Sequence, residues 1–164
     1  MLNIKIRIMT KVYFKNVFLF FAVILTLCSS QSFGQEYTGE SKIILETEKQ
    51  ALDKWINRNV WGYLNIFASD ATYFDQSTKM KLIGFDAVKA YIEPWNGKIY
   101  APRYEMINID IKVIGNVGVL NYNLYNFNES NDTTALWNST EIYEKKNGNW
   151  KIIHSHWSLV DLKK

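Results

Sequence analysis

The stretch Asn147–Ser158, NGNWKIIHSHWS, decides the fold of this sequence. Its Asn-Gly pair is a strong signal for a tight turn between antiparallel strands. The residues after the turn alternate in character and predict the last strand of a sheet. Similar runs with a period of two occupy residues 104–114, 119–127 and 135–145, and Asn-rich turns or loops separate them. Consecutive strands of this kind predict an antiparallel meander.

The first half of the chain has helical periodicity instead. Five apolar residues between positions 41 and 59 fall on one helix face, with Ser41 as the N-cap: Ile44, Ala51, Leu52, Trp55 and Ile56. The pattern then predicts a second helix from Val60 to about residue 69, a short strand over 71–78 and a third helix over 85–92. Helices followed by a curved antiparallel sheet predict an α+β domain.

Residues 1–34 have the features of a secretory signal peptide. Basic residues precede an apolar run of roughly 11 residues, which is shorter than the ~20 that a membrane-spanning helix needs. Small residues follow, and Ser32 and Gly34 fit the small-residue rule for cleavage. We therefore expect cleavage after Gly34, and a periplasmic or secreted mature protein that begins at Gln35.

Lipid attachment at Cys28 is the alternative to this processing. However, Leu27 precedes Cys28, where a lipoprotein signal has a small residue. We therefore expect an exported protein that has no membrane association after signal removal. Processing would also discard the only cysteine of the sequence, so no disulfide is expected.

The basic character of the chain belongs to its N-terminal segment. The sequence has 19 basic and 16 acidic residues, and four basic but no acidic residues lie within positions 1–34. The other 130 residues therefore carry a formal charge of −1, without a large basic cluster. This argues against a nucleic-acid partner. The length fits a polar leader, residues 35–40, followed by one domain over residues 41–164.

Three segments carry a family resemblance: GFDAVKAYIEPW at 84–95, VIGNV at 113–117 and TEIYEKKNGNWKIIHSHWS at 140–158. In order and spacing they resemble the SnoaL-like branch of the nuclear transport factor two-like superfamily. That superfamily includes ketosteroid isomerase and the association domain of calcium/calmodulin-dependent protein kinase. The resemblance implies a cone-shaped fold, in which N-terminal helices pack on a curved sheet and enclose a pocket. Such a fold hosts many functions and does not by itself identify one.

The resemblance also implies which strand residues face the pocket. In the kinase association domain, the positions that match Asn123, Glu141 and Trp157 carry basic pocket residues, and none is basic here, which argues against an acidic ligand. On the same assignment the pocket side holds Asn121, Asn123, Tyr125, Trp137, Ser139, Glu141, Ser155 and Trp157. The outer side holds Leu120, Tyr122, Leu124, Thr140, Ile142, His154 and His156. The apolar members of that outer set predict a homodimer through the outer sheet face.

Two histidines at positions i and i+2, His154 and His156, have a spacing that can chelate a metal ion. They are the only histidines of the sequence, so a metal site would need carboxylates from elsewhere. We therefore expect no metal site. The two side chains are interpreted as packing and hydrogen-bonding groups on the outer face.

Two carboxylates are candidates for proton transfer. Glu141, in mid-strand and facing an aromatic cavity, would lose hydration, which raises a carboxyl pKa and suits a general acid or base. The alternative is an exposed position beside an opposite charge. Asp75 ends a short strand near the expected cavity mouth, where Tyr73 and Tyr63 are possible hydrogen-bond donors. A turn or cap role is the alternative for Asp75.

Aromatic residues that border the family's pocket complete the expected site: Trp55, Trp61, Tyr63, Trp95, Trp137 and Trp157. Core packing is their alternative role. Together with Asn121 and Asn123, these aromatic residues predict a pocket for an uncharged organic ligand. Two functions remain open, a secreted small-molecule-binding domain and a cofactor-independent isomerase, cyclase or dehydratase. The sequence has no phosphate loop, nucleophile elbow or metal motif, so no cofactor is expected.

Overall fold

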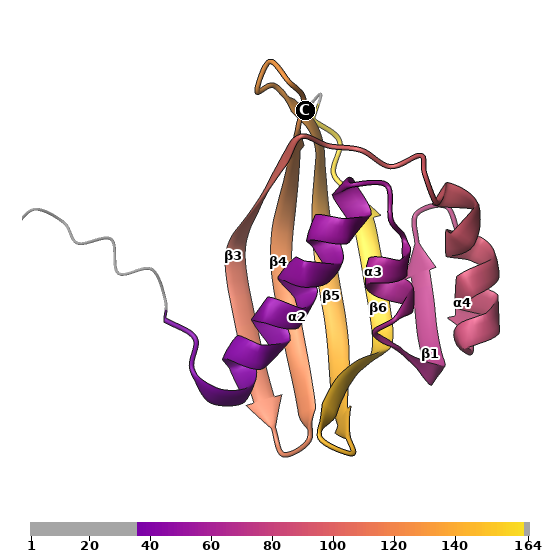
Figure 1. The fold of residues 1–164 in the computed structure, drawn as a ribbon, viewed down its shortest axis with the longest axis vertical. Coiled ribbons are helices and arrows are strands. Elements are labelled where there is room, and N and C mark those ends of the chain that lie inside the picture. Colours follow the sequence, from indigo (N-terminus) through magenta and orange to yellow (C-terminus); the bar gives the residue numbers. More distant parts are fainter. Residues whose placement is uncertain (1–35, 163–164) are drawn as a thin grey trace, which may run out of the picture. The chain divides into compact units, whose positions relative to one another are not determined.

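The computed structural model describes residues 36–162 (Figure 1). Its helices and strands, in chain order, are α2 (Gly39–Ile56), α3 (Trp61–Leu64), β1 (Phe67–Asp75), β2 (Leu82–Ile83), α4 (Phe85–Ile92), the 3-10 helix η1 (Glu93–Trp95), β3 (Arg103–Ile114), β4 (Val117–Phe127), β5 (Thr133–Lys146) and β6 (Asn149–Leu159). The described residues from Tyr37 onward form one compact unit. The predicted signal peptide, Cys28 and the cleavage position lie outside the described residues.

The six strands form one open sheet in the order β2-β1-β6-β5-β4-β3. Strands β3 to β6 are the antiparallel meander that the alternating pattern predicts. The α+β class, with N-terminal helices packed on a curved sheet, is confirmed. The sheet is nevertheless mixed. The meander begins at the edge strand β3 and ends at β6, and the remaining edge of β6 pairs with β1 in parallel.

The predicted second helix is much shorter than expected. Helix α3 covers only Trp61–Leu64, and β1 begins at Phe67, where the sequence pattern still predicts a helix. Phe67 pairs with Ile152 of β6, so the backbone of this segment satisfies the open edge of the sheet. The apolar spacing that suggests a helix is instead that of a buried strand, since tertiary pairing overrides a short local pattern.

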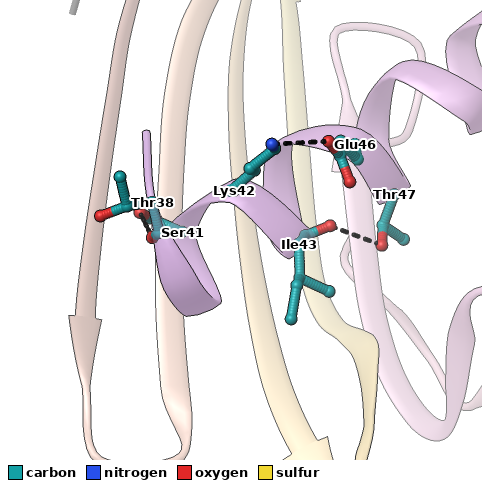
Figure 2. Close-up of polar contacts among 6 residues, drawn as sticks. All are labelled: Thr38, Ser41, Lys42, Ile43, Glu46 and Thr47. Carbon is teal, nitrogen blue, oxygen red and sulfur yellow. Dashed lines mark hydrogen bonds and ion pairs between the residues drawn. The ribbon is translucent and has the colours of Figure 1, made fainter. Parts of the chain in front are cut away.

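The start of α2 differs slightly from the prediction. Thr38 is the N-cap residue, and Ser41 lies in the first turn, where its Oγ donates to the Thr38 carbonyl oxygen at 2.8 Å (Figure 2). On the exposed side of the helix, Lys42 and Glu46 form an ion pair at 3.9 Å. In addition, Thr47 Oγ1 donates to the Ile43 carbonyl oxygen at 2.8 Å. These contacts are local and lie away from the core.

Residues predicted as a polar leader take part in the fold. The Tyr37 hydroxyl donates to the Ile109 carbonyl oxygen at 2.6 Å. Glu40, already in α2, accepts hydrogen bonds from Lys145 Nζ at 2.6 Å and Trp150 Nε1 at 2.7 Å. These bonds lower the pKa of the Glu40 carboxyl. They fix the N-terminal end of α2 to β5 and β6.

The face assignment of β4 is wrong by one residue. Leu120, Tyr122 and Leu124 are opposite Glu141, Ser139 and Trp137 of β5, and directly paired residues share a face. Leu120, Tyr122 and Leu124 are 0–3 % exposed and face the helices, whereas Asn121, Asn123 and Tyr125 lie on the outer face. A shift of one residue along a strand moves every side chain to the opposite face. In β4 the alternating apolar residues are the buried ones, and they fix the faces opposite to the family-based assignment.

The outer face matches the prediction in β5 and β6. Thr72 Oγ1 lies 2.7 Å from His154 Nδ1, and the Phe74 ring contacts the rings of both His154 and His156. These contacts confirm that both histidines pack on the outer face, and that His154 also has a hydrogen-bond partner there. In residues 36–162, no group of three or more His, Cys, Asp or Glu side chains is arranged to hold a metal ion.

The helices in this range are also too short or too polar to cross a membrane.

Candidate functional site

A cavity of about 330 Å³ lies between the helices and the inner face of the sheet. Its lining comes from α2, α3, α4 and η1, from four strands and from the segments that follow β1 and η1. The lining residues are Leu52, Trp55, Tyr63, Phe67, Tyr73, Asp75, Gln76, Ser77, Tyr91, Ile92, Trp95, Ile99, Leu124, Asn126, Ala135, Trp137, Ser155 and Trp157. A cavity of this size accommodates a small organic molecule.

Trp157 is the centre of the aromatic wall. Its ring makes edge-to-face contacts with Tyr63 at 6.4 Å, Tyr122 at 5.7 Å and Trp137 at 6.4 Å between centroids. Trp55 of α2 packs against Tyr63 in the same way at 5.8 Å. Edge-to-face geometry fixes each ring relative to its neighbours. The wall is therefore a connected set of rings from five elements, α2, α3, β4, β5 and β6.

The parallel pairing of β1 with β6 sets the polar side of the cavity. Its register places Tyr73 beside Ser155 and Asp75 beside Trp157. Paired residues share a face, so all four side chains lie on the inner side. The Asp75 carboxylate is thereby brought to the aromatic wall, although 82 residues separate it from Trp157 along the chain.

The Asp75 carboxylate accepts hydrogen bonds from four groups. Ser77 N and Thr78 N donate to Oδ1 at 2.8 and 3.1 Å. The Tyr73 hydroxyl donates to Oδ2 at 2.9 Å, and the Tyr91 hydroxyl lies 3.0 Å from both oxygens. Burial and the adjacent carboxylate raise the pKa of both tyrosines, which keeps their hydroxyls protonated as donors. Turn stabilisation and cavity lining are thus combined in one residue.

A second polar cluster is buried beneath the cavity. Glu48 of α2 is 0 % exposed, and its Oε1 accepts hydrogen bonds from Tyr63 at 2.6 Å and Tyr122 at 2.5 Å. The Tyr143 hydroxyl donates to Oε2. Burial raises the pKa of Glu48, and the three hydrogen bonds oppose that rise. Tyr63 belongs to both the cluster and the cavity wall, so it connects them.

Glu141 is also 0 % exposed and lies one hydrogen bond from the cavity. Its Oε1 accepts from Ser155 Oγ at 2.9 Å and Ser139 Oγ at 3.3 Å. Burial raises the pKa of Glu141 well above its usual value, and the nearby Glu48 raises it further. Its Oε2 has no hydrogen-bond partner among the described residues. The nearby Trp157 indole, like the two serines, opposes the rise of the Glu141 pKa.

Eight of the predicted site residues line the cavity: Trp55, Tyr63, Tyr73, Asp75, Trp95, Trp137, Ser155 and Trp157. Ser139 and Glu141 lie on the correct face but behind the lining, where Ser155 separates Glu141 from the cavity. Trp61 is at the surface, 37 % exposed, with Lys89 Nζ 5.4 Å from its ring centroid. Asn121, Asn123 and Tyr125 lie on the other side of the sheet, for the register reason given above.

The sequence reasoning missed four residues: Glu48, Tyr91, Asn126 and Tyr143. A signal for Glu48 was present, because it follows Ile44 by four residues and precedes Leu52 by four, on the apolar face of the helix. Tyr143 follows Glu141 by two in the same strand, so it shares the inner face. Asn126 follows Leu124 by two in β4, so the reversed face assignment of that strand hides it. The bond of Tyr91 to Asp75 is a long-range contact that no local pattern contains.

The geometry agrees with comparisons to known proteins. The sequence matches the SnoaL-like domain family over residues 44–161, which includes the helix α2 core face, the cavity and the whole meander. This chain belongs to the SnoaL-like domain family. No curated protein matches the sequence.

Solved structures share the fold of this SnoaL-like domain. A Parabacteroides distasonis protein, provisionally assigned as a ketosteroid isomerase, is 26% identical with a TM-score of 0.67, over 82% of this chain and 96% of that one. A Nostoc punctiforme protein of unknown function with a cystatin-like fold is 18% identical (TM-score 0.65; 78% and 97% covered). The S. rosetta CaMKII hub is 14% identical (TM-score 0.58; 76% and 100% covered). The last two similarities concern the fold alone.

The buried carboxyl of Glu141 predicts that stability falls as pH rises. Because the folded-state pKa is raised, this group's contribution is fully present below the unfolded-state pKa and is lost as pH rises through the folded-state value. We expect Glu141→Gln to reduce this decline, which amounts to at most about 1.4 kcal/mol per pH unit for one proton. Urea unfolding between pH 4 and pH 9 measures it. Glu46→Gln, on the exposed face of α2, is the control and should leave the profile unchanged; equal slopes for all three proteins would contradict the prediction.

Proposed function

We propose that this SnoaL-like domain binds a small, predominantly apolar organic molecule in its aromatic cavity. The observation that carries this proposal is the composition of the lining, in which eight of 18 side chains are aromatic. Burial of an organic ligand against such rings removes apolar surface from water, which is the main source of affinity in sites of this kind. The few polar groups at the mouth would orient the ligand.

The charges of the lining argue against an anionic ligand. Asp75 is the one formally charged residue among the described lining residues. A ligand carboxylate or phosphate in the same cavity would be repelled by Asp75 and would find no cation there. The expectation of an uncharged ligand rests partly on Asn121 and Asn123, which lie outside the cavity, so Asp75 becomes the main guide to ligand charge.

An isomerase, cyclase or dehydratase that transfers a proton without a cofactor is the second candidate. It is favoured by the Asp75 carboxylate, which lies in the lining beside the hydroxyls of Tyr73 and Tyr91. A carboxylate and tyrosine donors around one cavity are the groups that such chemistry uses. The similarity to a protein provisionally assigned as a ketosteroid isomerase agrees with this candidate. Glu141 would have to act through Ser155.

Blocking the cavity separates binding from nonspecific adsorption. Ala135 lines the cavity, whereas Leu136, the next residue of β5, is on the outer face opposite Tyr125. With 2-naphthol as a neutral aromatic probe, we expect saturable quenching of tryptophan fluorescence. Ala135→Trp should weaken the affinity at least tenfold, and Leu136→Trp should leave it unchanged.

Equal effects of the two substitutions would contradict binding in the cavity.

Mass spectrometry of molecules extracted from the purified protein then identifies the natural ligand. If the wild-type protein converts that molecule and Asp75→Asn slows conversion by about 10²–10⁴, the size typical of a lost general base, the second candidate replaces the first.

We also propose a homodimer through the outer face of the sheet. The CaMKII hub is a structural relative, and the residues Val119, Ile142 and Tyr125 on this face are only partly buried within one chain. Leu120, Tyr122 and Leu124 do not belong to this surface, because they face the helices. The interface would therefore combine a few apolar side chains with a polar surround.

Light scattering at tens of micromolar should give twice the monomer mass. Ile142→Asp places a charge in the proposed interface and should yield monomers. Ile43→Asp makes the same change at a 47 % exposed position on α2 and should leave the dimer intact. A wild-type monomer, or a dimer that persists in Ile142→Asp, would disprove this interface.

Export to the periplasm or medium is a further part of the proposal. Its support is the sequence pattern of residues 1–34. We expect N-terminal sequencing of the exported protein to begin at Gln35. A product that retains residues 1–34, or a lipid on Cys28, would contradict this processing.

A further inference from the structure

The negative charge of Asp75 has no cationic partner within residues 36–162. All of its hydrogen-bond donors are neutral groups, namely two backbone amides and the hydroxyls of Tyr73 and Tyr91. Among residues 36–162, none of the ion pairs includes Asp75. Neutral donors stabilise a carboxylate but leave its net charge in place. The cavity therefore carries an uncompensated negative charge.

The two carboxylate oxygens have different surroundings. Oδ1 accepts the amides of Ser77 and Thr78 and so stabilises the turn after β1, which is a common structural role of aspartate. Oδ2 accepts only the hydroxyls of Tyr73 and Tyr91, and both tyrosines line the cavity. The turn therefore accounts for Oδ1 but not for the position of Oδ2 inside an aromatic cavity.

Aromatic rings surround this charge. The rings of Tyr73 and Tyr91 are 5.7 Å apart, and both bond to Asp75. Trp157 is the β6 neighbour of Asp75 in the sheet, and Trp95 lines the same cavity. The faces of Trp and Tyr rings attract cations, and the attraction increases when water is excluded. Carboxylate and rings thus favour the same kind of guest, a positive charge on an apolar body.

A further acceptor in the lining lacks a donor. The side-chain oxygen of Asn126 is buried and has no hydrogen-bond partner among the described residues. The tyrosine hydroxyls of the lining already donate to Asp75. An ammonium group has several N–H donors and could therefore supply one to the Asn126 oxygen. A metal ion would fit less well, because the lining offers one carboxylate and mostly hydrophobic rings.

We propose that the cavity binds an organic ammonium ion, with its positively charged nitrogen on the cavity side of Asp75 and beside the rings of Tyr73 and Tyr91. This inference rests on the proposed function, since it names the class of small molecule that the cavity takes. The apolar part of the ligand lies against Trp137 and Trp157. The charge on the ligand acts as the counter-ion that the described part of the chain does not supply to Asp75.

Two probes of similar size test the charge of the ligand. 2-Phenylethylamine is a cation at pH 7, and 2-phenylethanol keeps the ring and a hydrogen-bond donor without the charge. Isothermal titration calorimetry of the protein beginning at Gln35, which contains the whole compact unit, compares the two. We expect the amine to bind at least tenfold more tightly than the alcohol.

Two matched substitutions locate the interaction. Asp75→Asn keeps an acceptor oxygen for the turn and removes the charge, and it should weaken amine binding at least tenfold without changing alcohol binding. Asp70→Asn removes the same charge from an exposed position of β1, where the side chain is 68% exposed, and should change neither. Circular dichroism spectra confirm that both variants are folded.

Each other outcome overturns the inference in a distinct way. If the alcohol binds as tightly as the amine, the ligand is not a cation, and the proposed cavity function stands. If Asp70→Asn weakens amine binding as much as Asp75→Asn does, the effect is one of overall charge and Asp75 is not the partner. If neither probe binds at millimolar concentration and 2-naphthol also fails, the inference and the proposed function both fail.

Discussion

The buried carboxyl of Glu48 is the constraint on which the rest of this domain depends. It accepts the hydroxyls of three tyrosines from α3, β4 and β5, so a single side chain of α2 fixes the helix to its neighbours. A carboxyl without water or hydrogen bonds would cost several kcal/mol, and the three donors offset that cost. Because these donors must meet one group, they also define the height and direction of α2 above the sheet.

The cavity follows from this arrangement. Helix α2 packs on the β3 and β4 side of the sheet, and α4 packs on β1 at the other side (Figure 1). Side chains from both sides line the space between them, and the edge-to-face rings around Trp157 form its wall. Tyr63 bonds to Glu48 and contacts Trp157, so the anchoring cluster and the wall share a residue. The position of the aromatic wall is thus coupled to the polar core.

The sequence predicts most of the fold because its signals there are local. Alternation identifies β3 to β6, and helical spacing identifies α2 and α4. The faces of β4 are predictable from its own apolar residues, Leu120 and Leu124, whereas the family correspondence gives the opposite faces. The strand at Phe67 and the pairing of Asp75 with Trp157 are long-range features, which a local pattern does not contain. Helical spacing also contains the buried position of Glu48 on α2, whereas the contact of Tyr91 with Asp75 is long-range and lies outside any local pattern.

The surroundings of Asp75 bear on which chemistry the cavity supports. To take a proton on Oδ2, the carboxylate would have to give up a hydrogen bond from Tyr73 or Tyr91, because that oxygen already accepts from both. To attract a cation it need not give up either bond, since charge attraction and the faces of the neighbouring rings act without a free lone pair on Oδ2. The turn amides on Oδ1 keep the carboxylate in one orientation in either case. The geometry therefore favours a fixed charge that binds a ligand over a base that moves a proton.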